Sequence, residues 1–413
     1  MTAGTCLSVI AGATLAGRAQ SASTADQISE LQKQNQALQQ RLDGLEDLVK
    51  KEGLMPSGAP PSKLVSSLSQ ITISGFAQAS YFYDVHHPST GYDPGYLWNT
   101  RVNSFSLNKV KITLASPPAE RSGEEWSAGF RVSLMAGEDA PELNSGNSIT
   151  GFDWLREAYV DLNVPIGKGL NVKAGELISL LNFESGDGGA VNPNFSQGYQ
   201  WWYTGNGPAA GVQLDYAFTD WLDVKARVDN GLYAGPVAVS TEKAVMGSVG
   251  LKPDSKSWVN FVGFGGAGAA SLEVDGGSVL GGRQFTDKLG TAFEFDFFHF
   301  VPEAASNGNL WSIGGWAWYD FTPKVGLAAR ADFLDDMDGM GIKGVELGGI
   351  SGTAITSPDP NGNLSSFTLT LNLRPTPNLK IQPEIRYNLT SYKGGFGGRK
   401  DQLIIGAGAS YLF

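Results

Sequence analysis

The chain has 413 residues, of which 41% are hydrophobic, 17% charged and 11% aromatic, and its formal net charge is −11. The aromatic content excludes a disordered chain, and the lack of an apolar run of about eighteen residues after the N-terminus excludes a helical membrane protein. The acidic balance argues against nucleic acid as a partner. Gly accounts for 54 residues, above its usual share of about 7%.

A short apolar segment opens the sequence. Residues 7–17 (LSVIAGATLAG) are followed by small residues at the spacing that signal peptidase reads. We therefore expect residues 1–22 to be a signal peptide whose basic n-region is truncated, with a short buried helix as the alternative. The only cysteine, Cys6, lies in this segment, so the mature chain is expected to contain no disulfide and no cysteine-bound metal.

Residues 26–51 carry a heptad pattern. The residues at positions a and d are Ile28, Leu31, Asn35, Leu38, Leu42, Leu45 and Val49. Because a single helix this polar is marginal in water, the pattern predicts an α-helical coiled coil between copies of the chain, in which dimer and trimer both stay open. One helix docked on the remaining domain is the alternative. Residues 52–70, rich in Pro and Gly, are expected to form a linker.

From residue 71 to 413 apolar and polar residues alternate in segments separated by turn residues. In 379–389, for example, Leu, Ile and Tyr alternate with Lys380, Glu384 and Arg386. The pattern fits a soluble sandwich or strands between lipid and a wet lumen. Alternating short and long connections, the terminal Phe413 and aromatic residues near the segment ends favour the membrane barrel. These aromatic residues are Tyr81, Tyr83, Trp154, Tyr216, Phe218, Trp221, Trp316, Trp318, Tyr319 and Phe321.

Fifteen segments are clear, and an even strand number requires one more, for which 277–285 is the candidate. The sequence thus predicts an all-β fold, a transmembrane antiparallel up-and-down β-barrel of about 16 strands over 71–413, with about 14 as the alternative. The clear segments are 71–83, 101–114, 124–135, 152–163, 169–181, 208–218, 221–230, 243–252, 257–268, 288–300, 309–320, 323–334, 364–374, 378–390 and 401–413.

Several strings in this region resemble the OmpL-like outer-membrane β-barrel porins of bacteria. They are Ser74–Phe76 with Asn103 and Phe105–Leu107, Arg156–Val160, Ala329–Phe333 with Asp335, Asp336, Asp338 and Gly339, Glu384–Tyr387, and the strand from Asp401. The resemblance covers about 71–413 and implies a sixteen-strand pore for hydrophilic solutes, without a defined substrate. The segment at 26–51 is similar to the N-terminal coiled coils of some trimeric porins.

The polar faces of the clearest segments predict the lumen wall. The basic residues expected there are Lys109, Lys111, Arg131, Lys225, Arg227, Arg330, Arg374, Lys380 and Arg386. The acidic residues expected there are Asp215, Asp223, Asp229, Asp332 and Glu384. Basic residues outnumber acidic ones, opposite to the whole chain, and a basic wall raises the local concentration of anions. We therefore expect a mild preference for anions; charges that pair across strands and only keep the channel wet are the alternative.

Two further loops are of interest. By resemblance to general porins, whose third loop folds into the lumen, Glu184 and Asp187 in the long connection 183–207 are candidates for the constriction; a solvated surface loop is the alternative. The acidic loop Asp335–Asp338 is a weak Ca²⁺ candidate, because it lacks the spacing of an EF-hand. An acidic loop at the channel mouth is the interpretation we favour. No other metal, cofactor or catalytic residue is predicted.

The predicted function is an outer-membrane porin for passive diffusion of small hydrophilic solutes and ions. A substrate-selective channel, for phosphate or sugar, is the alternative; an outer-membrane enzyme or adhesin is weaker, since no Ser string marks a nucleophile near His299. The expected partners are outer-membrane lipid and lipopolysaccharide, the solutes, two further copies in a homotrimer, and peptidoglycan or a periplasmic partner at the coiled coil. No nucleic acid is expected.

Overall fold

The computed structural model describes most of the chain after residue 69. The described ranges are 70–88, 91–96, 100–101, 103–144, 152–232, 234–237, 241–268, 272–303, 306–343 and 353–413. The predicted signal peptide (1–22), the predicted coiled coil (26–51) with its seam, and all but the last residue of the predicted linker (52–70) lie outside these ranges.

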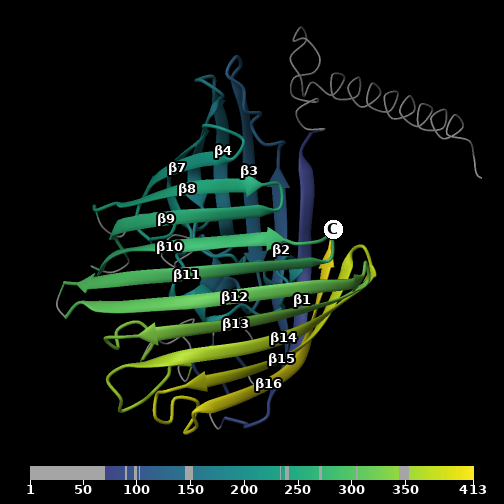
Figure 1. The fold of residues 1–413 in the computed structure, drawn as a ribbon, viewed down its shortest axis with the longest axis vertical. Helices are drawn as coiled ribbons and strands as arrows, with labels where there is room; N and C mark the ends of the chain where they lie inside the picture. Colours follow the sequence, from purple (N-terminus) through teal and green to yellow (C-terminus); the bar gives the residue numbers. More distant parts are fainter. Residues whose placement is uncertain are drawn as a thin grey trace, which may run out of the picture. The chain divides into compact units, whose positions relative to one another are not determined.

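Sixteen antiparallel strands form a closed barrel, in which each strand pairs with its neighbours in sequence and β1 pairs with β16 (Figure 1). The strands are β1 (Thr72–Asp84), β2 (Ser104–Ala115), β3 (Ser127–Ala136), β4 (Leu155–Val164), β5 (Leu170–Leu177), β6 (Ala209–Ala217), β7 (Leu222–Asp229), β8 (Ala244–Asp254), β9 (Ser257–Ala267), β10 (Leu272–Gln284), β11 (Leu289–Pro302), β12 (Gly308–Thr322), β13 (Val325–Asp336), β14 (Gly362–Thr376), β15 (Leu379–Thr390) and β16 (Asp401–Leu412). The predicted sixteen-strand barrel is confirmed.

The barrel closes at the two ends of the described chain. Ala79 of β1 lies opposite Ala409 of β16. Phe413 lies just beyond the end of β16. The backbone N–H of Gly75 on β1 donates to the carbonyl of Phe413 at 2.9 Å, and the N–H of Phe413 donates to the carbonyl of Gly75 at 3.0 Å. Closure leaves no strand edge without a partner, which is the condition for a sheet to cross hydrocarbon.

In the described parts of the connections lie three short helical segments: α3 (Ala140–Leu143), the 3₁₀ turn η1 (Gly188–Ala190) and α4 (Tyr199–Tyr203). None of the helices in the described ranges is long and apolar enough to span a membrane.

The weakest predicted strand, 277–285, is part of the longer β10. Its pattern is faint because glycines interrupt it: a Cβ built on Gly281 would lie only 2.8 Å from the carbonyl oxygen of Trp258 on β9. In the opposite direction, the predicted strand 169–181 ends at Leu177 in β5. The chain leaves the wall there, so the last four predicted strand residues belong to a loop.

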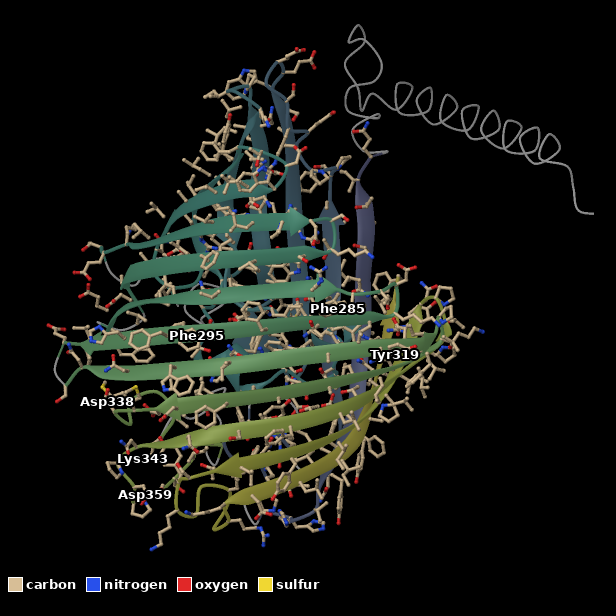
Figure 2. All side chains as sticks on the ribbon, viewed as in Figure 1. Phe285, Phe295, Tyr319, Asp338, Lys343 and Asp359 are labelled. Atoms are coloured by element: carbon tan, nitrogen blue, oxygen red, sulfur yellow. The ribbon has the colours of Figure 1, made fainter. Side chains whose placement is uncertain are left out.

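Side-chain exposure on the strands is the reverse of that in a soluble barrel. Phe105 and Leu107 on β2 are 87% and 58% exposed, whereas Lys109 and Lys111 on the same strand are buried. Figure 2 shows the outer face with Phe295 and Tyr319 on it, and Tyr319 lies at the opposite end of the strands from Asp338. Apolar side chains therefore face outward, as contact with lipid requires, and polar side chains face the interior.

Most aromatic residues at the strand ends are exposed on the outer face, among them Trp154, Phe218 and Trp221. For Trp316 and Trp318 the outward interpretation is wrong. Both lie on the inward face of β12 together with Ser312 and Gly314, and the rings of both pack against Phe183, with centroids 4.8 and 6.2 Å apart.

Candidate channel constriction

Residues 178–208, which we call the inner loop, join the neighbouring strands β5 and β6 and reach the opposite wall of the barrel. The N–H of Phe183 donates to Glu294 on β11 at 2.7 Å, and the N–H of Tyr199 to Asp332 on β13 at 2.9 Å. The N–H of Phe195 donates to Glu384 on β15 at 2.9 Å. A loop that reaches from β5 to β15 through these bonds crosses the interior of the barrel.

The inner loop also receives hydrogen bonds from the wall near the chain termini. The Nζ of Lys380 on β15 donates to the carbonyls of Gly189 and Asn192 at 2.9 and 2.6 Å. The ring of Phe195 packs against Phe82 of β1, and a Cβ built on Gly408 of β16 would lie 2.0 Å from that ring. The loop therefore requires a residue without a side chain at position 408.

Three predicted residues meet at one buried cluster. Arg330 Nη1 lies 3.0 Å from Glu184 Oε1, and Arg330 Nε lies 3.3 Å from Asp332 Oδ1. The second carboxylate oxygen of Glu184 accepts the N–H of Gly198 at 2.7 Å. All three charged side chains are nearly inaccessible to solvent. A buried charge without its partner is costly, so this cluster fixes the loop to β13.

Asp187, the second candidate for the constriction, contacts a different part of the wall. Its carboxylate lies 2.8 Å from Lys111 Nζ on β2, and its carbonyl accepts a hydrogen bond from Gln78 of β1 at 3.0 Å. Both acidic candidates thus bind basic residues of the wall, and each helps to hold the inner loop in place.

All fourteen predicted wall residues lie on the inward face, Lys109 and Lys111 because a register shift between β1 and β2 changes the alternation after Leu107. Most of the basic ones have acidic partners. Lys109 pairs with Asp139 at 3.0 Å, Arg131 with Glu157 at 2.6 Å, Lys225 with Asp223 at 2.6 Å, Arg227 with Asp229 at 2.9 Å and Arg374 with Asp320 at 2.7 Å. The guanidinium of Arg386 lies 3.1 Å from the centroid of the Tyr96 ring.

Several inward charges were not predicted from the sequence. Glu294 and Asp296 alternate with Phe293, Phe295 and Phe297 on β11, a clear period of two that the sequence contains. Including such acids reduces the expected excess of basic residues on the wall.

Arg156 escaped for a different reason. Arg156 is itself the extra residue of a β-bulge on β4, since Ser133 pairs with Glu157 and Leu134 with Leu155. Alternation through Glu157 would send the side chain of Arg156 outward, but the bulge leaves both residues buried.

The paired charges differ in how far they reach into water. Arg131 is 37% exposed and its partner Glu157 only 4%. Arg121, in the turn after β2, is 38% exposed and its partner Asp215 on β6 only 10%. At these pairs the positive group is the more exposed partner.

A cavity of about 430 Å³ lies between the inner loop, α3 and the loop after β7. Its lining includes Arg156, Asn182, Phe183, Trp201, Trp202 and Asn206. Two carboxyl groups also line it, those of Glu184 and Glu142. Burial raises the pKa of Glu142 to about 7.

The acidic loop after β13 uses its carboxylates within the protein. Asp336 accepts hydrogen bonds from the N–H groups of Met340, Gly341 and Ile342, and Asp338 accepts two from Asn309. Within the described part of the chain no group of three or more His, Cys, Asp or Glu residues could hold a metal ion. His299, the histidine considered above for a catalytic role, lies 3.1 Å from Asp275 on the outer face.

The family comparison agrees with this architecture. A model of the family described as "Putative beta-barrel porin-2, OmpL-like" matches residues 70–413. The chain belongs to this family. It is therefore an integral β-barrel of the outer membrane, and its family and fold are those of a channel.

Solved structures share the fold at low sequence identity. The anion-selective porin from Comamonas acidovorans is 11% identical, with a TM-score of 0.56, covering 83% of this chain and 99% of the porin. OprB of Pseudomonas putida is 12% identical, with a TM-score of 0.56, over 84% and 96%. The trimer form of OmpT of Vibrio cholerae is 10% identical, with a TM-score of 0.52, over 83% and 99%. A comparison with curated proteins gives no match.

Proposed function

We propose that this porin is a passive diffusion channel for small hydrophilic solutes and ions, with a mild preference for anions. The observation that carries the proposal is the inner loop, which is fixed across the interior by hydrogen bonds to β11, β13 and β15. Such a loop narrows a sixteen-strand barrel, which without it encloses a wide aqueous channel.

The exposure of the paired charges supports the preference for anions. Arg131 and Arg121 reach further into water than the acids that they pair with. Lys225, which is 26% exposed, also reaches further than Asp215 and Asp223, which are 10% and 18% exposed. Charges near the path of an ion act more strongly on it than recessed charges, because water and salt screen the field over about 10 Å.

The assembly and the segments before the barrel belong to the same proposal. We infer a homotrimer, which the trimer form of the similar OmpT supports. We further propose that residues 1–22 direct export of the chain. In the mature trimer, residues 26–51 form the coiled coil, and residues 52–70 link the coiled coil to the barrel. Lipopolysaccharide around the barrel, and peptidoglycan or a periplasmic partner at the coiled coil, complete the expected contacts.

The proposed channel is tested by electrical recordings in a planar bilayer. The purified full chain in a planar bilayer should give discrete conductance steps, and a salt gradient should give a reversal potential of the sign expected for anion preference. Clear cation preference would contradict the selectivity, and a folded barrel without conductance would contradict the channel. The cavity beside the inner loop favours a second candidate, a substrate-selective channel, over an enzyme or an adhesin.

A further inference from the structure

Arg156 on β4 is a buried positive charge that no carboxylate of the described residues contacts. Its side chain is 8% exposed, and its Nη1 donates to the carbonyl of Leu143 at the end of α3. Among the described residues no carboxylate oxygen lies within 4.0 Å of its guanidinium. Residues 145–151, which follow α3, contain no Asp or Glu.

Three acids act electrostatically on Arg156, in decreasing order Asp187, Glu157 and Glu176 of the neighbouring strand β5, and Glu176 also acts on Arg227. The first two contact other cations. Glu157 binds Arg131 at 2.6 Å, and Asp187 binds Lys111 at 2.8 Å. A buried cation without a contacting counterion is costly in a protein interior. An anion that reaches Arg156 from the lumen would therefore gain more than it would at the paired charges of the wall.

The cavity of about 430 Å³ offers such an anion a place next to Arg156. A Cβ built on Gly186 of the inner loop would lie 2.9 Å from Nη2 of Arg156, so the glycine leaves that end of the guanidinium close to the loop. Glu184, which also lines the cavity, is bound to Arg330 at 3.0 Å. The remaining acid, Glu142, has a pKa of about 7 and is about half charged at neutral pH.

The other walls of the cavity are aromatic. Phe183, Trp201 and Trp202 contribute their rings, and the indole N–H of Trp201 donates to the carbonyl of Glu184 at 2.7 Å, which fixes the orientation of that ring. Phe183 is held from behind by Trp316 and Trp318. Rings fixed in this way offer flat apolar faces to a solute.

We propose that this cavity is a binding site for organic monocarboxylates that carry a flat apolar body, such as an aromatic ring. The carboxylate binds the guanidinium of Arg156, and the ring of the solute packs on Trp201, Trp202 and Phe183. The inference rests on the proposed diffusion channel and names a class of solute that it holds. The cavity volume lies in the range of about 300–1,000 Å³ that is typical of small-molecule sites.

Binding is tested on the purified full chain in detergent by tryptophan fluorescence. Phenylacetate is titrated against acetate, which lacks the ring, and 2-phenylethanol, which lacks the charge. Phenylacetate should bind at least about tenfold more tightly than either probe. Equal affinity for acetate, or for 2-phenylethanol, would overturn the proposal.

Two variants locate the site. Arg156→Gln should weaken phenylacetate binding by about tenfold or more, and Arg156→Lys by less, because lysine keeps the charge but not the bidentate geometry. Trp202→Leu should weaken the binding of phenylacetate but not that of acetate. The matched control is Arg283→Gln on β10, an exposed arginine whose partner is Asp254 at the end of β8. Unchanged binding in Arg156→Gln would overturn the proposal.

A bilayer measurement separates this inference from the channel itself. Phenylacetate should reduce the chloride current of the wild type in a saturable way, and less so in Arg156→Gln. If the wild type conducts but phenylacetate neither blocks it nor changes its fluorescence, the site is wrong and the channel stands. If fluorescence shows saturable binding that depends on Arg156 but no current flows, the site stands and the channel is wrong.

Discussion

The two sides of the barrel use the same residue types for different purposes. On β13 and β15 the inward charges Arg330 and Lys380 bind the inner loop, and Arg330 is fully buried. On β3–β7 ion pairs such as Arg131–Glu157 and Lys225–Asp215 join neighbouring strands, and the two basic groups reach water. These inward charges therefore hold the loop on one side of the barrel, and at the pairs on the other side they leave positive groups partly exposed.

The largest expected effect is on the side that holds the loop. Arg330→Gln leaves Glu184 and Asp332 buried without their cation, so we expect a loss of about 3–5 kcal/mol in the free energy of unfolding. The freed loop should also raise single-channel conductance. Urea unfolding in detergent and bilayer recordings measure the two effects. Unchanged conductance together with full stability would show that this cluster does not hold the loop.

A smaller effect is expected at Gly408, where a Cβ would lie 2.0 Å from the ring of Phe195. Gly408→Ala should cost about 1–3 kcal/mol through overpacking, or displace the loop and raise conductance. The control is Gly315→Ala on β12, where no atom lies within 4 Å of the added Cβ. Equal stability and conductance in the two variants would refute the close packing.

On the open side a substitution should alter selectivity more than stability. Arg131→Gln removes an exposed charge that pairs with Glu157. We expect about 1 kcal/mol of lost stability, because Arg131 is partly exposed and the buried Glu157 keeps Ser133 at 2.8 Å and Lys111 at 3.9 Å. The reversal potential in a salt gradient should move toward cation preference. A shift in the opposite direction would mean that Arg131 does not face the ion path.

The smallest expected effect concerns pH. The pKa of Glu142 is raised to about 7 by burial, so this carboxyl is mostly neutral at pH 6 and mostly charged at pH 8. Anion preference should therefore fall slightly as the pH rises from 6 to 8. Glu142→Gln should show less of this change. A variant with the same pH dependence as the wild type would assign the titration to another group.

The alternation of side chains was enough to predict the barrel. Each strand has lipid on one side and the lumen on the other, so apolar and polar residues alternate along its sequence. The glycine-rich β10 was predicted from the requirement for an even number of strands. The same rule failed at Arg156, where a β-bulge changes the phase, and an assumption about strand ends misplaced Trp316.

The partners of the inner loop could not be predicted from local patterns. Phe195 and Glu384, joined by a hydrogen bond, are 189 residues apart in the sequence. Resemblance to other porins pointed to Glu184 and Asp187, but only the folded chain shows which basic residue each one binds. Whether the fourteen predicted wall residues line the ion path stays a prediction.

The seam between β1 and β16 constrains how the barrel is assembled. Gln78 and Ser410, which are 332 residues apart, are joined across this seam by a hydrogen bond of 3.0 Å. The strand β1 can pair with β16 only after the C-terminal residues have joined the sheet. Until then the sheet keeps an unpaired edge. Contacts this distant in sequence form slowly. The exported chain therefore needs protection from aggregation in the periplasm, and loss of its final strand would leave a sheet that cannot seal.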